Sequence, residues 1–429
     1  MQISLSQRLD DDVVFDVLTR VPVKSLIRFR CVSKSWYSTI SSSIFITAHL
    51  HRAKSSSSNN NNNRGYLLYS PFPNELNFSS YKELCTASYN SDRTLTHISR
   101  FRVPFSYDFL VSFCNGMLCL NSIKGRGNVI YLWNPSIRKF KKLLATPLTY
   151  PFHDVVVGLA YHSQNNDYKI LRIVPYKESR GSEVPAIEAE IYTLSTDLWR
   201  RVVISVDSFS GSGPSIGCID DIHESFCIFY NGALHSIACC GDYNFILSFD
   251  VDDERFREIL LPQNYLDGVC GQVECLTVFK GSLALIVFGK TLPEGSDLCH
   301  LWVMKEYGVA KSWTKKSLPI ENVAQFFGCT VNGELLIEKF NHCNILSFEP
   351  ESLNEEILRI PELGCMIYTT DFVESLVLLD GVNTSSEYEN QQVGVFSKAL
   401  MFLKFILKSH WAASKCYLFG KDHFGHHSY

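Results

Sequence analysis

The chain has 429 residues, of which 46 % are hydrophobic and 20 % charged, and its formal net charge is −4 at neutral pH. That length is too great for one small domain, and the composition is typical of an ordinary globular protein. The weak negative charge excludes a global attraction to nucleic acid, and neither an apolar leader nor an apolar run long enough to span a bilayer occurs. We therefore expect a cytoplasmic or nuclear protein with no membrane span.

The chain contains fifteen cysteines. Their number is odd, and many stand in apolar surroundings, as do Cys114, Cys119, Cys227, Cys275 and Cys329. This pattern predicts buried thiols in a reducing compartment and not a disulfide framework. No Cys-x-x-Cys pair is present, so we expect no metal site and no cofactor.

Residues 9–50 have the spacing of short helices. Asp10 to Asp12 stand where a helix can begin, because acidic side chains cap free N–H groups and meet the positive end of the helix dipole. Pro22 ends this helix and opens a second, and Ser33 is the expected cap of a third. The apolar face of the first helix is expected to hold Val13, Val14, Val17, Leu18 and Val21. Three helices of this size bury little surface, so we expect them to dock on something larger.

Charge is unevenly distributed in this segment. No acidic residue occurs between Asp16 and Glu75. In contrast, five basic residues fall within one short run, namely Arg20, Lys24, Arg28, Arg30 and Lys34. Such a basic face suits an acidic protein partner or a nucleic acid, and it is also what a solvated surface looks like. On charge alone we favour the solvated surface.

Residues 14–36 read V-x-x-V-L-T-R-V-P-V-K-S-L-I-R-F-R-C-V-S-K-S-W. This run closely resembles the F-box of plant F-box proteins, and the resemblance extends over residues 9–50. It implies that the segment binds a Skp-type adaptor and, through it, the cullin and RING protein of an SCF ubiquitin ligase. The positions that match the motif, and that the resemblance assigns to adaptor binding, are Leu9, Leu18, Val21, Pro22, Val23, Leu26, Cys31, Val32 and Trp36. The family usually begins with Leu-Pro, and the corresponding pair here is Leu9-Asp10.

A polar run separates this segment from the rest of the chain. Ser55 to Ser58 is followed by Asn59 to Asn63, so residues 51–65 are predicted to form a flexible linker. From residue 66 to 381, aromatic and β-branched residues alternate with polar ones in short runs broken by Gly, Pro, Asn and Asp. That composition is typical of strands and turns.

A unit with a tight turn recurs in this region. The turns are Asn115-Gly116, Asn231-Gly232, Lys280-Gly281 and Asn332-Gly333. Such pairs suit hairpins that require positive φ, and the later turns are about fifty residues apart, the period of kelch-like propeller blades. The segments 158–174 and 189–203 would form the unit between the first two turns, and the unit that begins at Tyr66 lacks such a turn. The run from Met366 to Leu379 would close the ring, because closure removes exposed sheet edges.

The sequence thus predicts a mainly β fold, in which a small α-helical N-terminal domain precedes a kelch-like β-propeller of about six imperfect blades. An irregular β-sandwich is the alternative. The expected domains are residues 1–50, a linker 51–65, the propeller 66–381 and a tail 382–429.

Several segments of the predicted propeller also carry a resemblance. They are LCL at 118–120, LWNPSIRK at 132–139, EIYTLSTDLW at 190–199, ILSFDV at 246–251, LWVMKEYG at 301–308 and SWTK at 312–315. This region resembles the F-box-associated region of plant F-box/kelch-type proteins, and the order of the segments is most similar to the S-locus F-box and S-locus-like subgroup. For that subgroup the resemblance implies stylar ribonucleases of pollen incompatibility as targets.

The tail has no role implied by the resemblance. Residues 395–407 predict an amphipathic helix with interleaved lysines, for which we favour packing over association with a membrane surface. Cys416, His423, His426 and His427 lack the spacing of a metal site.

We therefore predict a non-catalytic substrate receptor of an SCF ligase. It would hold a target protein on propeller loops and so lead to the target's ubiquitination and proteasomal degradation. The receptor would promote ubiquitination by raising the effective concentration of the target near the ligase, and it would take no part in the bond chemistry. The insertions Pro175 to Glu188 and Ser205 to Glu224 are the loops expected to bind the target. A ligase-independent propeller scaffold is the alternative. An enzyme is disfavoured, since the phosphate-loop-like Gly289-Lys290-Thr291 has Ala284 where a glycine is required.

Overall fold

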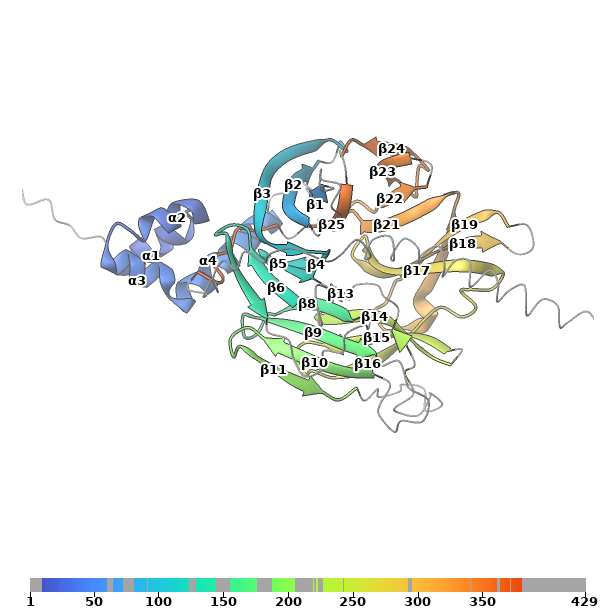
Figure 1. The fold of residues 1–429 in the computed structure, drawn as a ribbon, viewed down its shortest axis with the longest axis horizontal. Helices are drawn as coiled ribbons and strands as arrows, with labels where there is room; N and C mark the ends of the chain where they lie inside the picture. The colour runs from blue at the N-terminus through green and yellow to red at the C-terminus, as the bar shows by residue number, and fades with distance from the viewer. Residues whose placement is uncertain are drawn as a thin grey trace, which may run out of the picture.

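The structure is a computed structural model that describes residues 10–59, 65–71, 81–90, 92–122, 129–143, 155–175, 187–204, 219, 221–222, 227–241, 243–291, 295–340, 342–360, 363–370 and 372–379. A small helical domain stands at one side of a six-bladed β-propeller (Figure 1). The predicted mainly β fold with a helical N-terminal domain and about six blades is therefore confirmed. In the described ranges no helix is both long and apolar enough to cross a membrane.

The helical domain consists of α1 (Asp11–Thr19), α2 (Val23–Phe29), α3 (Lys34–Ser41) and α4 (Ser43–Asn59). The first three are the predicted helices. Asp10 precedes α1 without making a side-chain cap bond, whereas the Ser33 side chain caps α3 by accepting from the backbone N–H of Trp36 at 3.1 Å. Pro22 stands at the N-cap of α2, as its fixed φ favours.

Helix α4 was not predicted. It extends past residue 50, where the helical domain is expected from the sequence to end. It runs through residues 51–59, the first part of the expected linker. The apolar first half of α4 buries Phe45 in the helical domain and Leu50 against the propeller. Packing of this kind stabilises a helix whatever its intrinsic propensity, and it continues past residue 50 with Ala53, which also packs on the propeller cluster. Tertiary contact thus overrides the polar composition.

The propeller blades are four- or five-stranded antiparallel sheets. Blade 1 contains β25 (Leu363–Thr369), β1 (Gly65–Pro71), β2 (Tyr81–Tyr89) and β3 (Leu95–Tyr107). Blade 2 contains β4 (Phe109–Cys114), β5 (Met117–Ser122), β6 (Val129–Asn134) and β7 (Lys139–Leu143). Blade 3 contains β8 (Val156–His162), β9 (Asp167–Pro175), β10 (Ile187–Thr193) and β11 (Leu198–Val202).

Blade 4 contains β12 (Asp221–Ile222), β13 (Ile228–Tyr230), β14 (Ala233–Cys240), β15 (Tyr243–Asp250) and β16 (Phe256–Leu260). Blade 5 contains β17 (Val269–Phe279), β18 (Ser282–Thr291), β19 (Asp297–Met304) and β20 (Trp313–Leu318), with the short 3-10 helix η1 (Ala310–Ser312) before β20. Blade 6 contains β21 (Val323–Cys329), β22 (Leu335–Lys339), β23 (His342–Phe348) and β24 (Glu355–Leu358).

The core lies between the blades. The innermost strands β25, β4, β8, β13, β17 and β21 contact one another in turn around the ring. Each pair of neighbouring blades encloses an apolar cluster. This explains why inner strands such as β8 are buried along their whole length, since other blades cover both their faces, whereas the outer strand β11 is largely exposed.

In four blades a predicted glycine turn joins two consecutive strands: β4 to β5, β13 to β14, β17 to β18 and β21 to β22. Asn115 and Gly116 have φ values of 46° and 83°, and Asn231 and Gly232 have 49° and 76°, so both turn positions are left-handed. Such hairpins demand Asn or Gly because other side chains strain at positive φ. Blade 1 has no such turn for a topological reason: its innermost strand β25 comes from the other end of the propeller region and pairs with β1.

The predicted closing run is confirmed in its first part and differs in its second. Strand β25 ends at Thr369 and closes the ring, but residues 372–379 are not a strand. They turn toward the helical domain, where Leu376 and Leu379 belong to its apolar cluster. We call residues 372–379 the closing segment.

Most described cysteines are free thiols. Burial raises the pKa of Cys227 to about 11 and that of Cys329 to about 12, so both thiols are neutral at physiological pH. These two neutral thiols agree with the expectation that the cysteines are buried and behave as small hydrophobic side chains. Cys240 differs from the expectation because it is disulfide-bonded.

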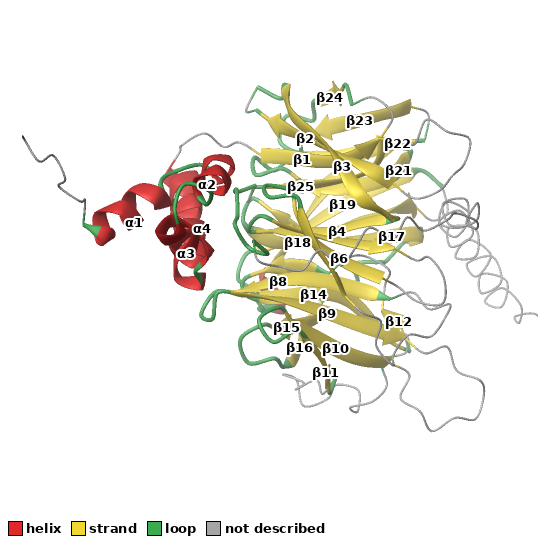
Figure 2. Cartoon of the chain, turned by 60° about the vertical axis from the view of Figure 1, so that its left-hand side comes forward, coloured by secondary structure: helices red, strands yellow, loops and turns green. Residues whose placement is uncertain are grey.

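The helical domain occupies one face of the propeller (Figure 2). Asn166 in the β8–β9 turn and Ile137 in the β6–β7 turn contact the helical domain. Because neighbouring strands are antiparallel, the chain leaves the innermost strand and the third strand from the centre on this face, and it leaves the second and the outermost strand on the opposite face. Strand β9 ends and β10 begins at that opposite face, as do the end of β11 and the start of β12. The insertions predicted to bind the target lie mostly outside the described residues, as does the tail 382–429.

Candidate functional site

The four helices and the closing segment share one apolar core. Leu18 of α1, Leu26 of α2, Ile40 of α3 and Phe45 of α4 meet there, and each is at most 2 % exposed. Partly buried side chains surround this core, among them Ile137 from the turn between β6 and β7. The helical domain therefore shares its core with residues of the propeller region and packs directly against the propeller.

The structure divides the predicted adaptor-binding residues into groups. Leu18, Val23 and Leu26 are buried in the core of the helical domain, with exposed fractions of 2 %, 0 % and 0 %. Val21 and Trp36 are partly buried around it, and Trp36 packs on the ring of Phe29. A buried side chain cannot contact a partner without unfolding its surroundings, so the first group shapes the surface and does not form it. Pro22, Cys31 and Val32 are exposed, and Leu9 lies outside the described residues.

Several large apolar side chains of this small domain are exposed. Val13 and Val17 of α1 are 47 % and 53 % exposed, Val32 is 64 %, Tyr37 of α3 is 52 % and Ile44 of α4 is 74 %. We call these five residues the helical apolar surface. Covering such side chains with a protein partner would remove apolar area from water. Pro22 and Cys31 are exposed as well, so a partner can reach them without unfolding the domain.

The sequence pattern did not identify Val13 and Val17 as surface residues. Five apolar residues of the first helix were expected to form one buried face. In the structure Val14, Leu18 and Val21 face the core, while Val13 and Val17, four positions apart, point outward. The sequence did contain a sign of this, because the five apolar residues span a wide part of the helix circumference. Adjacent valines at 13 and 14 cannot both lie at the centre of one helical face.

Helix α4 fixes the helical domain to blades 2 and 3. Leu50 and Ala53 join the apolar cluster between these blades. His51 contacts the side-chain oxygen of Asn166 at 2.7 Å, and the Lys54 ammonium lies 4.7 Å from the centre of the Tyr161 ring. These contacts set the orientation of the helical domain on the propeller.

Charged residues of the domain are exposed or partly exposed. Asp16 bridges Arg20, at 2.7 Å, and Arg52, at 2.9 Å, which ties α1 to α4. The Arg20 guanidinium holds the pKa of this carboxyl below its usual value. The Arg30 guanidinium lies 4.5 Å above the ring of Tyr37. Lys24, Arg28 and Lys34 are exposed, in agreement with a solvated basic face.

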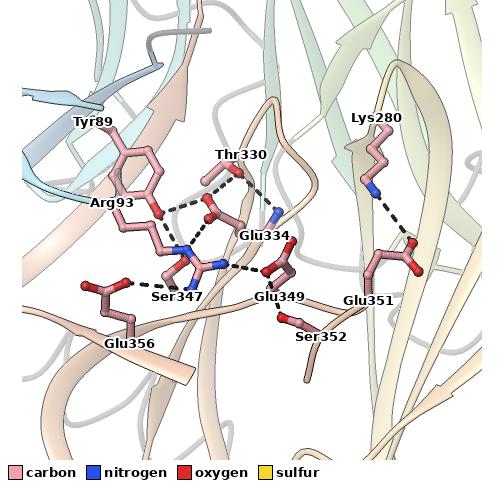
Figure 3. A network of polar contacts seen from close by, with 10 residues as sticks. All are labelled: Tyr89, Arg93, Lys280, Thr330, Glu334, Ser347, Glu349, Glu351, Ser352 and Glu356. Carbon is pink, nitrogen blue, oxygen red and sulfur yellow. Dashed lines mark hydrogen bonds and ion pairs between the residues drawn. The ribbon is translucent and has the colours of Figure 1, made fainter. Parts of the chain in front are cut away.

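A second polar cluster lies where the ring closes (Figure 3). Arg93, in the turn between β2 and β3 of blade 1, donates to Glu334 at 2.7 Å and to Glu349 at 2.6 Å, both in blade 6. Tyr89 donates to Glu334 at 2.8 Å, and so does Thr330 at 2.9 Å. Arg93 and Tyr89 of blade 1 thus bond to carboxylates of blade 6, so we interpret the cluster as a latch between these two blades and not as a binding site.

Two kinds of site considered from the sequence can be compared with the described residues. Among them no group of three or more His, Cys, Asp or Glu is arranged to hold a metal ion. The sequence Phe288 to Thr291 lies within strand β18, where no phosphate-binding loop can form.

Comparison with known proteins agrees with this architecture. Residues 75–375 match the F-box associated beta propeller domain family, and residues 6–47 match the F-box domain family. The F-box/kelch-repeat protein At3g23880 of Arabidopsis thaliana is 28 % identical over 313 residues, which cover 71 % of this chain and 77 % of that protein. The F-box protein At3g07870 of the same plant is 27 % identical over 333 residues, covering 72 % of each chain.

A third relative extends over more of the chain. The Arabidopsis F-box protein CPR1 is 25 % identical over 395 residues, which cover 86 % of this chain and 88 % of that protein. The propeller-domain match alone spans more than half of the sequence. The chain therefore belongs to the plant F-box proteins that carry an F-box associated β-propeller domain.

Proposed function

We propose that this chain is a non-catalytic substrate receptor of an SCF-type ubiquitin ligase, acting in the cytoplasm or nucleus. Its helical domain would bind a Skp-type adaptor and, through it, the cullin and RING protein, while the propeller holds a target for ubiquitination and proteasomal degradation. The observation that carries the proposal is the helical apolar surface on a domain of the F-box family.

The adaptor contact is assigned to exposed residues. Val17 and Val32 are more than half exposed, and Pro22 and Cys31 are exposed beside them in sequence. Covering such side chains with a partner removes apolar area from water, which stabilises a complex by roughly 25 cal/mol per Å². Leu18, Val23 and Leu26 would support this contact from beneath.

The target contact is assigned to the propeller face opposite the helices. The strand ends that flank the insertions 175–188 and 205–224 lie on that face, and loops on a rigid scaffold are common recognition elements. A fixed helical domain on the other face would hold the target at a defined position relative to the ligase. The S-locus-like resemblance makes a stylar ribonuclease one target to test, and it rests on the sequence segments alone.

The adaptor assignment is tested in the full chain with Val17 and Val32 both changed to Asp. Val203→Asp is the matched control, because Val203 is 80 % exposed but lies after β11 on the propeller. We expect the double variant to bind a purified Skp-type adaptor at least about tenfold more weakly, since two charges would be desolvated, while the control binds normally. Equal binding by all three proteins would disprove the assignment, and no binding even by the native chain would favour the ligase-independent scaffold.

The target assignment has a separate test. Residues 175–188 and 205–224 are transplanted into a related receptor of known target choice, with blade 2 turns transplanted as the control. Transfer of target choice with the insertions alone supports the proposal, and unchanged choice refutes it.

A further inference from the structure

The core of the helical domain is completed from the far end of the propeller region. Leu376 is fully buried and Leu379 is 5 % exposed, and both pack with Leu18, Val23 and Phe45 in a single apolar cluster. Four short helices alone would leave part of that core in water. Small domains need most of their apolar area covered to be stable, so these two leucines are structural members of the domain.

The closing segment also holds the start of helix α2. The Glu374 carboxylate accepts the backbone N–H of Val23 at 2.9 Å, across 351 residues of sequence. Pro22, at the N-cap, has no side-chain group that could satisfy this N–H. A carboxylate at this place also meets the positive end of the helix dipole. The chain between α1 and α2 is held beside it by buried His49, whose Nε2 lies 3.1 Å from the Val21 carbonyl oxygen.

The position of the closing segment depends on the propeller. The Asn134 side-chain amide donates to the carbonyls of Ser375 and Val377 at 2.9 and 2.8 Å, and Val373 packs in the cluster between blades 2 and 3. The segment also follows β25, the strand whose pairing with β1 closes the ring. If the ring were open, the closing segment would therefore lose the contacts with the propeller that hold it in position.

We propose that residues 372–379 are an integral part of the adaptor-binding domain, so that the helical domain acquires its adaptor-binding form only when the propeller ring has closed. The part of the proposal that concerns adaptor binding rests on the proposed function. The part that concerns completion of the helical core by residues 372–379 does not depend on it. Its consequence is that an incompletely folded receptor does not enter a ligase, because the ligase-facing surface and the completed propeller form together.

One pair of glycines offers a matched test. A Cβ atom at Gly116 would lie 2.5 Å from Ser375 Cβ and 2.8 Å from the Val373 carbonyl oxygen, so alanine there must displace the closing segment. Gly232 occupies the same position of an Asn-Gly hairpin in blade 4, with φ of 76° against 83°, and a Cβ there meets nothing within 4 Å. Gly116→Ala and Gly232→Ala thus share the strain of the turn and differ in the contact with the closing segment.

The first measurement is limited trypsin digestion of the full-length native chain and both variants. Trypsin cleaves after the basic residues of the helical domain, such as Arg20, Lys24 and Arg28, only where the chain opens locally. We expect at least tenfold faster cleavage between residues 20 and 34 in Gly116→Ala than in Gly232→Ala, while the propeller fragment resists in both. Equal rates in the two variants would overturn the proposal.

A second variant guards against a poorly folded Gly116→Ala protein. Leu376 and Leu379 are both changed to Ala in the full chain, and Leu285→Ala, in the buried apolar cluster between blades 4 and 5, is the control. We expect the double variant to show fast cleavage at residues 20–34 and roughly tenfold or weaker adaptor binding, and the control to show neither. Native-like cleavage of the double variant would overturn the proposal.

The two readouts separate this inference from the proposed function. If the native chain binds no adaptor, the proposed function fails, and the trypsin comparison still decides whether the closing segment completes the domain. If the native chain binds the adaptor and the Leu376/Leu379 variant binds equally well, the proposed function stands and the inference fails.

Discussion

At the scale of the residue, His235 shows how burial sets the chemistry of a polar side chain. It is fully buried in blade 4, with its Nδ1 3.2 Å from the Ile228 carbonyl and its Nε2 2.7 Å from the Tyr307 hydroxyl. These contacts suit a neutral ring that donates through Nδ1 and accepts at Nε2. Burial lowers its pKa to about 4.

This depressed pKa predicts a loss of stability in acid. Between about pH 6.5 and pH 4 the unfolded chain binds a proton at His235 and the folded chain does not, so the free energy of unfolding falls as the pH falls. The effect disappears well above pH 6.5 and reaches on the order of 3 kcal/mol near pH 4. Urea unfolding of the native chain and of His235→Gln at several pH values measures it, and the variant should show a flatter profile. His51→Gln is the control, because His51 is exposed. A His235→Gln profile as steep as the native one would refute the prediction.

At the scale of the element, the latch formed by Arg93 joins a turn of blade 1 to blade 6. The Arg93 side chain is 20 % exposed and that of Glu334 is 6 % exposed, so their ion pair is largely shielded from water. Changing Arg93 to Met leaves the Glu334 charge with two hydroxyl donors and no cation. Hydrogen bonds between charged groups of this kind contribute about 1.5–3 kcal/mol, and we expect Arg93→Met to destabilise the chain by about 2 kcal/mol.

The chain supplies a matched control for this element. Arg100 and Glu83 form an ion pair between β2 and β3 of the same blade, but their side chains are 58 % and 41 % exposed. Exposed pairs contribute about 0–1 kcal/mol, so Arg100→Met should unfold at nearly the native denaturant midpoint. Chemical denaturation of both variants compares them directly, and equal destabilisation would show that the latch is not a special contact.

At the scale of the whole molecule, one strand decides whether the propeller is a ring. Strand β25 pairs with β1, and these two strands come from opposite ends of the propeller region. Without β25, the β1 edge exposes unpaired backbone groups that can pair with other chains. We therefore expect a chain ending at residue 362 to lose its monomeric form and to aggregate, as size-exclusion chromatography would show.

The control for ring closure is a chain that ends at residue 379. It keeps β25 and the closing segment, and it lacks the same residues beyond 379 as the shorter chain. It should elute as a monomer with native far-ultraviolet circular dichroism. A monomeric, fully folded chain 1–362 would show that closure by β25 is dispensable.

The sequence by itself determined the repeating features of this protein. The first three helices, the Asn-Gly hairpins, the approximate blade number and a closing strand that includes Met366 all follow from local patterns, because helical spacing, turn residues and strand alternation act over a few neighbours. The F-box resemblance likewise rests on a contiguous run and agrees with the family match.

Only the tertiary structure decided how these pieces meet. Helix α4 crosses a polar run that predicts a linker, because its apolar half packs on two surfaces at once. Val13 and Val17 face water while Val14 and Leu18 do not, since the partners of α1 lie on one side only. Leu376 and Leu379 complete a core more than three hundred residues earlier in the chain. Such contacts depend on the path of the whole backbone, and no local pattern of residues encodes them.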